Sequence, residues 1–151
     1  MANGFKETSP GASLVAIHDS ARPLVTAEEC ATCFRDAMIV GAAVLGVPVK
    51  PTIKEVAEDG FVVKTLERST LWEVQTPQVI EPALLREGLD MVARDGLAVT
   101  DDVSIIEAMG KPVKITKGLY TNIKVTTPDD MSIAERFLGE LTASDQATIA
   151  A

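Results

Sequence analysis

Lys124 lies in a short stretch whose composition suits the binding of a phosphate group. Residues 122–126 (Asn-Ile-Lys-Val-Thr) alternate between polar and apolar types, and a period of two predicts a strand with its three polar side chains on one face. A helix start follows, because Thr127 suits the N-cap and Pro128 the first helical position. Asp129 and Asp130 would meet the positive end of that helix dipole. Taken alone, the pattern also fits a solvated lysine on a strand edge.

Three further segments occur in a fixed order before this lysine. They are residues 17–23 (Ile-His-Asp-Ser-Ala-Arg-Pro), residues 67–78 (Glu-Arg-Ser-Thr-Leu-Trp-Glu-Val-Gln-Thr-Pro-Gln) and residues 99–102 (Val-Thr-Asp-Asp). Together the four motifs closely resemble the 2-C-methyl-D-erythritol 4-phosphate cytidylyltransferases, enzymes of the non-mevalonate route to isoprenoids. The resemblance spans residues 14–138. The sequence at residues 54–56 and 71–73 resembles plant and algal members more than bacterial ones.

The resemblance also indicates a missing part. The family opens with a strand and a Gly-rich loop that carries an arginine and a lysine and wraps the CTP triphosphate. No such segment precedes residue 14, and residues 1–5 resemble the end of a mid-chain helix of the family. We therefore expect the chain to correspond to the C-terminal two-thirds of the enzyme. As an isolated fragment it is expected to bind CTP poorly and to turn over negligibly.

The reaction that the resemblance implies joins CTP to methylerythritol phosphate and gives CDP-methylerythritol and pyrophosphate. Its nucleophile is a phosphate monoester, whose second pKa of about 6 leaves it largely dianionic near neutral pH. Such a nucleophile needs no general base. It needs positioning against the α-phosphorus and cations that offset two converging anions. Mg²⁺, held mainly by the CTP phosphates, would complete the charge balance, and no metal-ligating residue is assigned to the chain.

By the same resemblance, Lys124 matches the lysine that holds the sugar phosphate near the α-phosphate. Arg68 matches an arginine that reaches across a dimer to that phosphate, a task that suits a guanidinium fork. The remaining matches face the substrate: Asp19 and Arg22 at its hydroxyl-bearing end, and Thr52, Thr76 and Thr100 on an arm and on loops.

Each assignment has a structural alternative. His18 could act in acid–base catalysis, but no base is required, and we interpret it as structural or as a lining residue. Asp101 and Asp102 could bind a metal, although a helix cap is the interpretation we favour. Asp19 could merely end a strand and order a nearby arginine, and Arg68 could be an ordinary exposed hairpin residue.

Two rival functions share these motifs. One is a sister cytidylyltransferase that acts on ribitol 5-phosphate, since the scaffold and the cations would be the same. The other is a catalytically inactive remnant that serves only as a dimerising partner. The residues alone do not separate them.

Composition excludes several other classes. The 151 residues are 46% hydrophobic and 24% charged, which suits one soluble domain with a sizeable core. A net charge of −8 argues against nucleic acid as a partner. No apolar run reaches the roughly 20 residues that span a bilayer. The compartment would be the plastid stroma for a plant or algal protein and the cytoplasm for a bacterial one.

Cys30 and Cys33 form a C-x-x-C spacing that is also found in redox and zinc sites. Here the spacing falls on a predicted helix whose start, Thr26 to Glu29, reads as a capping box. Too few further ligands are available for zinc. We therefore predict core packing, on an apolar helical face formed by Cys30, Cys33, Phe34, Ala37 and Met38.

The chain alternates between strand and helix patterns. Strands are expected at 14–17, 42–47, 113–116 and 122–125, and helices at 27–39, from 82 to Gly96, at 102–109 and at 128–141. This order predicts an α/β, Rossmann-like nucleotidyltransferase fold with a mixed, mostly parallel sheet. Residues 52–56 and 61–66, joined through Asp59-Gly60, predict a projecting β-hairpin. We expect a partial catalytic domain over 1–141, with an arm at about 50–72 that dimerises the protein, and a flexible tail over 142–151.

Overall fold

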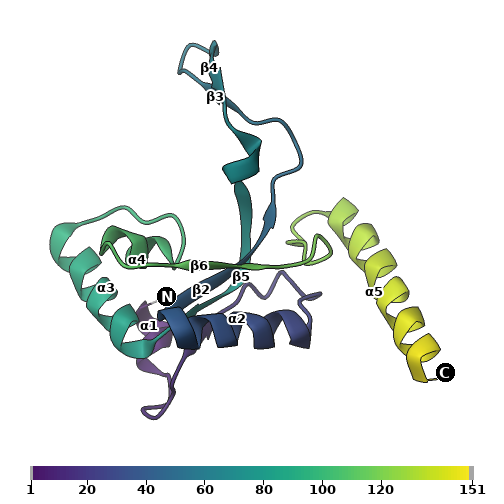
Figure 1. Ribbon diagram of the computed structural model, residues 1–151, viewed down its shortest axis with the longest axis horizontal. Helices are drawn as coiled ribbons and strands as arrows, with labels where there is room; N and C mark the ends of the chain where they lie inside the picture. Colours follow the sequence, from purple (N-terminus) through teal and green to yellow (C-terminus); the bar gives the residue numbers. More distant parts are fainter. Residues whose placement is uncertain (1, 150–151) are drawn as a thin grey trace.

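The computed structural model describes the backbone of residues 2–149 and the side chains of residues 2–140. A four-stranded sheet lies at its centre (Figure 1). Its strand order is β1 (Val15–Ile17), β5 (Trp72–Ile80), β2 (Ala42–Pro48) and β6 (Lys114–Lys117). β5 is antiparallel to β1 and β2, whereas β2 and β6 are parallel. Three of the four strands described in this sheet therefore share one direction, and the predicted mixed α/β fold is confirmed.

Helices cover both faces of this sheet. One apolar cluster includes Val44 and Ile80 and packs beneath α1 (Ala2–Lys6), α3 (Pro82–Asp95) and α4 (Ser104–Ala108). The other includes Leu45 and Val79 and packs beneath α2 (Ala27–Val40). Neighbouring residues of β2 and β5 thus enter opposite clusters, as a period of two requires. Burial on both faces explains why residues 42–47 are almost continuously apolar.

The predicted start of α2 and the predicted stop of α3 both form as expected. In α2 the Thr26 hydroxyl accepts the Glu29 N–H and the Glu29 carboxylate accepts the Thr26 N–H, which completes the capping box. α3 ends at Gly96, whose φ of 65° is left-handed. Cys33 is fully buried in the sheet-facing cluster, and this burial raises the pKa of its thiol to about 11. Core packing is therefore confirmed for Cys33, whereas Cys30 is only partly buried and lies outside this cluster.

The apolar face of α2 is narrower than predicted. Cys33 and Ala37 are buried, but Phe34 and Met38 are 38% and 63% exposed. Phe34 and Met38 each follow a buried residue by one position, which places them on the flank of the buried stripe.

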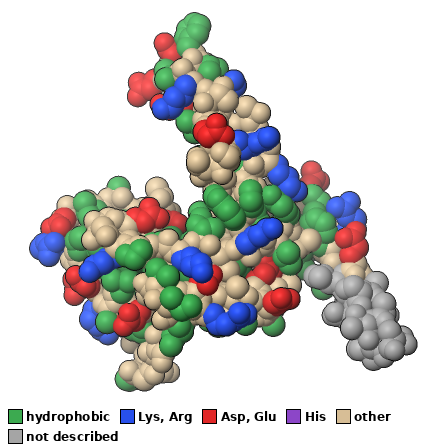
Figure 2. Space-filling view, in the orientation of Figure 1, with side chains coloured by type: hydrophobic (Ala, Val, Ile, Leu, Met, Phe, Trp, Pro, Cys, Tyr) green, Lys and Arg blue, Asp and Glu red, His purple; other side chains and the backbone are tan. Residues whose placement is uncertain are grey.

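The hairpin forms a separate two-stranded antiparallel sheet of β3 (Lys54–Val56) and β4 (Val62–Thr65). It stands out from the central sheet as an arm (Figure 1), and a 3-10 turn, η1 (Arg68–Thr70), leads from it into β5. Apolar side chains gather at its tip (Figure 2), where Val56, Phe61, Val62 and Val63 are 53–75% exposed. The projecting hairpin is confirmed, and its role in dimerisation stays a prediction.

Residues 122–125 do not form the predicted strand. They run as an irregular segment in which the Ile123 N–H bonds to the Thr121 carbonyl and the Val125 N–H bonds to the Ala21 carbonyl. Although the Asn122 side chain bonds to β5, the backbone of these residues is not part of either described sheet, so the alternating pattern forms no ladder.

β5 was not predicted at all, because Gln75, Thr76, Pro77 and Gln78 interrupt any apolar alternation. Helix bounds differ as well. α4 begins at Ser104 rather than 102, and α5 (Pro128–Ile149) extends past the expected end near 141. The division into a domain over 1–141 and a flexible tail stays a prediction, and residues 1, 150 and 151 lie outside the described residues. None of the described helices is long and apolar enough to cross a membrane.

Candidate functional site

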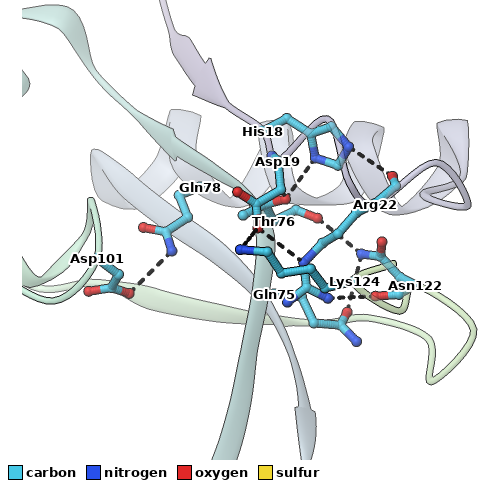
Figure 3. Close-up of polar contacts among 9 residues, drawn as sticks. All are labelled: His18, Asp19, Arg22, Gln75, Thr76, Gln78, Asp101, Asn122 and Lys124. Atoms are coloured by element: carbon cyan, nitrogen blue, oxygen red, sulfur yellow. Dashed lines mark hydrogen bonds and ion pairs between the residues drawn. The ribbon is translucent and has the colours of Figure 1, made fainter. Parts of the chain in front are cut away.

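A cleft of about 660 Å³ opens where β1 ends, and it collects most of the predicted site residues. Its lining includes five of them: Asp19, Arg22, Thr76, Thr100 and Lys124. Asp19 follows the carboxyl end of β1, the position at which open α/β sheets bind ligands. Thr76 comes from β5 and Lys124 from the irregular segment before α5 (Figure 3). Thr100 comes from the loop before α4.

Asp19 joins the two cations of this cleft. Its Oδ2 lies 3.0 Å from Lys124 Nζ and 3.7 Å from Arg22 Nε. Lys124 keeps half of its side chain exposed, whereas Arg22 is only 8% exposed and donates from Nη1 to the Asn122 carbonyl at 2.7 Å. The lysine can therefore reach a ligand in the cleft, while the arginine is held inside the protein.

His18 has both ring nitrogens in use. Nε2 lies 3.1 Å from the Arg22 carbonyl, which can only accept, so this nitrogen carries a proton. The Thr76 hydroxyl lies 2.8 Å from Nδ1 and accepts the Asp19 N–H at 3.1 Å. In the neutral ring, Thr76 donates to Nδ1. The imidazole thus orders Thr76 and the Asp19 turn, in agreement with a structural interpretation (Figure 3).

The loop that carries Thr100 is fixed to β5. Gln78 donates to Asp101 Oδ2 at 3.2 Å and accepts the Val103 N–H at 2.8 Å. Asp101 Oδ1 also accepts the N–H of Ser104, the first residue of α4, whereas the N-cap position itself is Val103, which makes no side-chain cap. Burial, reinforced by Asp101, raises the pKa of Asp102. Among the described residues, no group of three or more His, Cys, Asp or Glu side chains could hold a metal ion.

Arg68 and Thr52 lie elsewhere. Both are exposed at the base of the arm, and Arg68 Nη1 donates to the Lys50 carbonyl at 2.8 Å. Neither lines the cleft of its own chain. Their predicted contacts with substrate would require the cleft of another subunit, and they stay predictions.

Three site residues were missed: Gln75, Gln78 and Asn122. They are 2%, 4% and 0% exposed, and all three bond to neighbouring segments of the site. Each stood inside a recognised motif, but an isolated amide gives no sequence signal of burial. Their types become informative only once the segments that surround them are placed.

The cleft is not uniformly basic. Carboxylates of Asp19, Asp101, Asp102 and Glu107 line it beside Arg22 and Lys124. An anion that binds Lys124 must therefore share it with Asp19 or displace that carboxylate. The arrangement can hold a small polar ligand with one anionic group and several hydroxyls, because one accessible cation is surrounded by acceptors and threonine hydroxyls.

Fold and cleft together define an α/β protein with a polar cleft that opens at the carboxyl end of β1. The family model for 2-C-methyl-D-erythritol 4-phosphate cytidylyltransferase (IspD) matches residues 1–140, and the chain belongs to this family. A rice protein named as the chloroplastic enzyme is 60% identical over 138 residues, which are 91% of this chain and 46% of the rice protein. A Synechocystis relative of the same name is 43% identical over 93% of this chain and 61% of its own.

Solved structures agree with the family assignment. The 4-diphosphocytidyl-2C-methyl-D-erythritol synthase of Anaerococcus prevotii has a TM-score of 0.85 at 28% identity, over 91% of this chain and 64% of that one. The cytidylyltransferase of Thermus thermophilus has a TM-score of 0.80 at 34% identity, over 90% and 66%. The chain spans about half the length of the first curated relatives that it matches. The resemblance to plant members is confirmed by the rice protein.

Proposed function

We propose that this chain supplies the sugar-phosphate site of a cytidylyltransferase that transfers CMP from CTP to 2-C-methyl-D-erythritol 4-phosphate. Membership of the family supports the reaction. The observation that carries the assignment of the site is the convergence of Asp19, Arg22, Thr76, Thr100 and Lys124 on one cleft, from four separate segments.

In this proposal Lys124 binds the phosphate of the sugar substrate. Its half-exposed ammonium is a compact charge on a long stem, so it can move from Asp19 to a phosphate oxygen without a change of backbone. The phosphate dianion then attacks the α-phosphorus of CTP, and pyrophosphate leaves. Lys124 lowers the barrier by offsetting charge between two anions, and it transfers no proton.

Asp19 becomes free to accept a hydrogen bond from a sugar hydroxyl when Lys124 turns to the phosphate. Thr76, already ordered by His18 and by the Asp19 N–H, stands at the same end of the cleft. Thr100 faces the cleft from the opposite loop. Hydroxyls and carboxylates on two sides suit a polyol, because each can bond to a different sugar hydroxyl.

The arm provides the second part of the proposal. Its exposed apolar tip suits burial against another subunit, and we propose a homodimer in which the arm of one subunit embraces the other. Arg68 at the arm base would then reach the substrate phosphate in the partner's cleft. A bidentate guanidinium would hold the phosphate from the side opposite Lys124.

Mg²⁺ is proposed only as an ion held mainly by the CTP phosphates. The described carboxylates do not fit a site of their own for it, since Asp19 is paired with Lys124 and Asp101 accepts hydrogen bonds from Gln78 and Ser104. For the compartment we propose the plastid stroma if the protein comes from a plant or alga, and the cytoplasm if it is bacterial.

A hybrid enzyme tests the function. The region of the rice relative that matches this chain is replaced by residues 1–140, and pyrophosphate release is measured with CTP and methylerythritol phosphate. We expect turnover comparable to that of the rice enzyme, and little turnover with ribitol 5-phosphate. Preference for ribitol 5-phosphate would contradict the proposed substrate. A folded hybrid that turns over neither substrate would contradict the proposed activity.

A further inference from the structure

The segment that carries Lys124 is held by buried polar side chains rather than by a sheet. Between β6 and α5, residues 118–127 contain no strand. A side chain on an irregular segment is placed precisely only when the backbone beneath it is fixed by other contacts. Here those contacts come from β5, from α2 and from the turn that follows β1.

Asn122 is the centre of these contacts. Its side chain is fully buried, and Nδ2 donates to the Thr76 carbonyl at 3.0 Å and to Gln75 Oε1 at 3.3 Å. Its own carbonyl accepts from Arg22 Nη1 at 2.7 Å. One residue two positions before Lys124 is thus fixed to β5 on one side and to the Asp19–Arg22 turn on the other (Figure 3).

A second anchor lies three residues earlier, at Leu119. Its N–H bonds to Glu29 Oε1 at 2.7 Å, and its carbonyl accepts from Gln75 Nε2 at 3.0 Å. Gly118 allows this close approach, because a Cβ there would lie 2.7 Å from Gln75 Oε1. Gln75 therefore bonds to both anchors, and its buried amide leaves the segment little freedom.

We propose that Asn122 is the positioning residue for Lys124: it fixes the lysine in the cleft through Gln75, Thr76 and Arg22, and it affects substrate only through that lysine. The role rests on the proposed function, since it concerns binding of the sugar phosphate. It predicts that removal of the Asn122 amide lets Lys124 leave the cleft, because the Thr76 carbonyl and Gln75 lose their shared donor.

The test uses the chain of 151 residues in five forms: wild type, Asn122→Ala, Lys124→Ala, the double variant and Thr121→Val. The last is a matched control, since the Thr121 hydroxyl is buried without a hydrogen-bond partner and can be lost without breaking a contact. Affinity for methylerythritol 4-phosphate is measured by calorimetry. The rate at which an amine-reactive reagent acylates Lys124 is measured by mass spectrometry, with Lys117 as the internal reference.

We expect Asn122→Ala to weaken binding on the order of tenfold, with little change in Thr121→Val. In the Lys124→Ala background, Asn122→Ala should have no further effect, because the two residues act as one unit. Lys124 should be acylated several-fold faster in Asn122→Ala, with Lys117 unchanged. An equal loss of affinity with and without Lys124, or an unchanged acylation rate, would overturn the proposal.

Failure of the proposed function gives a different result. If the wild type binds no sugar phosphate, the function is wrong, and the acylation rates of Lys124 still decide the positioning role. If urea unfolding shows that Asn122→Ala does not fold, Asn122→Asp replaces it, since it keeps the size of the side chain and loses the donor.

Discussion

Lys124 and Asp19 form an ion pair whose two members are both proposed to meet the substrate. At 3.0 Å and half exposed, the pair is easily exchanged for contacts with a ligand. In the free protein it keeps the lysine pointing into the cleft. Binding of an anion would then replace one partner of the ammonium by another, which costs less than desolvating a lone charge.

Lys124→Ala in the hybrid enzyme should lower kcat/KM. The fall should correspond to a loss of about 3–4 kcal/mol of transition-state stabilisation, comparable to the loss of one oxyanion donor. Lys124→Arg should recover only part, because a planar fork does not replace a compact charge. The measurement is kcat/KM against pH. Since the lysine transfers no proton in this account, the pH profiles of the wild type and Lys124→Ala should have the same shape. A basic limb that is present in the wild type and absent in Lys124→Ala would indicate acid–base catalysis by the lysine.

The sequence motifs predicted the residues that line the cleft better than they predicted the buried residues that support it. Asp19, Arg22, Thr76, Thr100 and Lys124 reach one cleft as the motifs suggested. The amides that support them were missed, since a buried Gln or Asn is defined by partners that are distant in sequence. Arg68 lies outside the cleft of its own chain and donates to the Lys50 carbonyl, so its contact with substrate stays a prediction.

Among the elements, those with local signals were predictable. α2 and α3 begin and end within a residue or two of their capping and glycine signals, and the Asp-Gly turn locates the arm. The sequence patterns led to two opposite errors: β5 was not predicted although it forms, and a strand was predicted at residues 122–125 although none forms. β5 carries polar side chains that are buried by the site, whereas residues 122–125 have the pattern of a strand but make no backbone ladder with β5 or any other described strand.

The start of α5 should respond to acid through Asp130. Its carboxylate accepts the N–H groups of Thr126 and Thr127, and these hydrogen bonds lower its pKa from 3.8 to about 2. Because the pKa is lower in the folded state, the cap stabilises the helix start above pH 3.8 and is lost as the pH falls through about 2.

We expect the amide chemical shifts of Thr126 and Thr127 to titrate near pH 2. Asp130→Asn should abolish this titration, and Asp129→Asn, which removes the neighbouring carboxylate, should not. A midpoint near pH 4 in the wild type would show that the cap does not form.

Gly88 determines how closely α3 and α4 pack. A Cβ at this position would overlap the side chain of Ile105 and lie 3.1 Å from Met109 Sδ. Gly88→Ala should therefore destabilise the fold by about 1–3 kcal/mol, as overpacked cores do. Gly139→Ala in α5 is the control, since nothing lies within 4 Å of a Cβ there. Equal urea midpoints for the two variants would contradict the packing.

At the scale of the whole molecule, the proposed site is shared between two subunits. Arg68→Ala and Lys124→Ala hybrids should each be nearly inactive, yet a mixed dimer would keep both cations in one of its two clefts. Random pairing should restore roughly a quarter of wild-type activity. The control mixes Arg68→Ala with itself. Mixed dimers that form without recovering activity would exclude the contribution of Arg68 across the interface.

The position of the sugar phosphate tests the central claim most directly. The measurement is a crystal structure of the hybrid enzyme with methylerythritol 4-phosphate. The account predicts the phosphate about 2.7–2.9 Å from Lys124 Nζ, as charge-assisted hydrogen bonds require, with Asp19 turned from the lysine toward a sugar hydroxyl. A phosphate bound away from Lys124, with the Asp19–Lys124 pair intact, would contradict it.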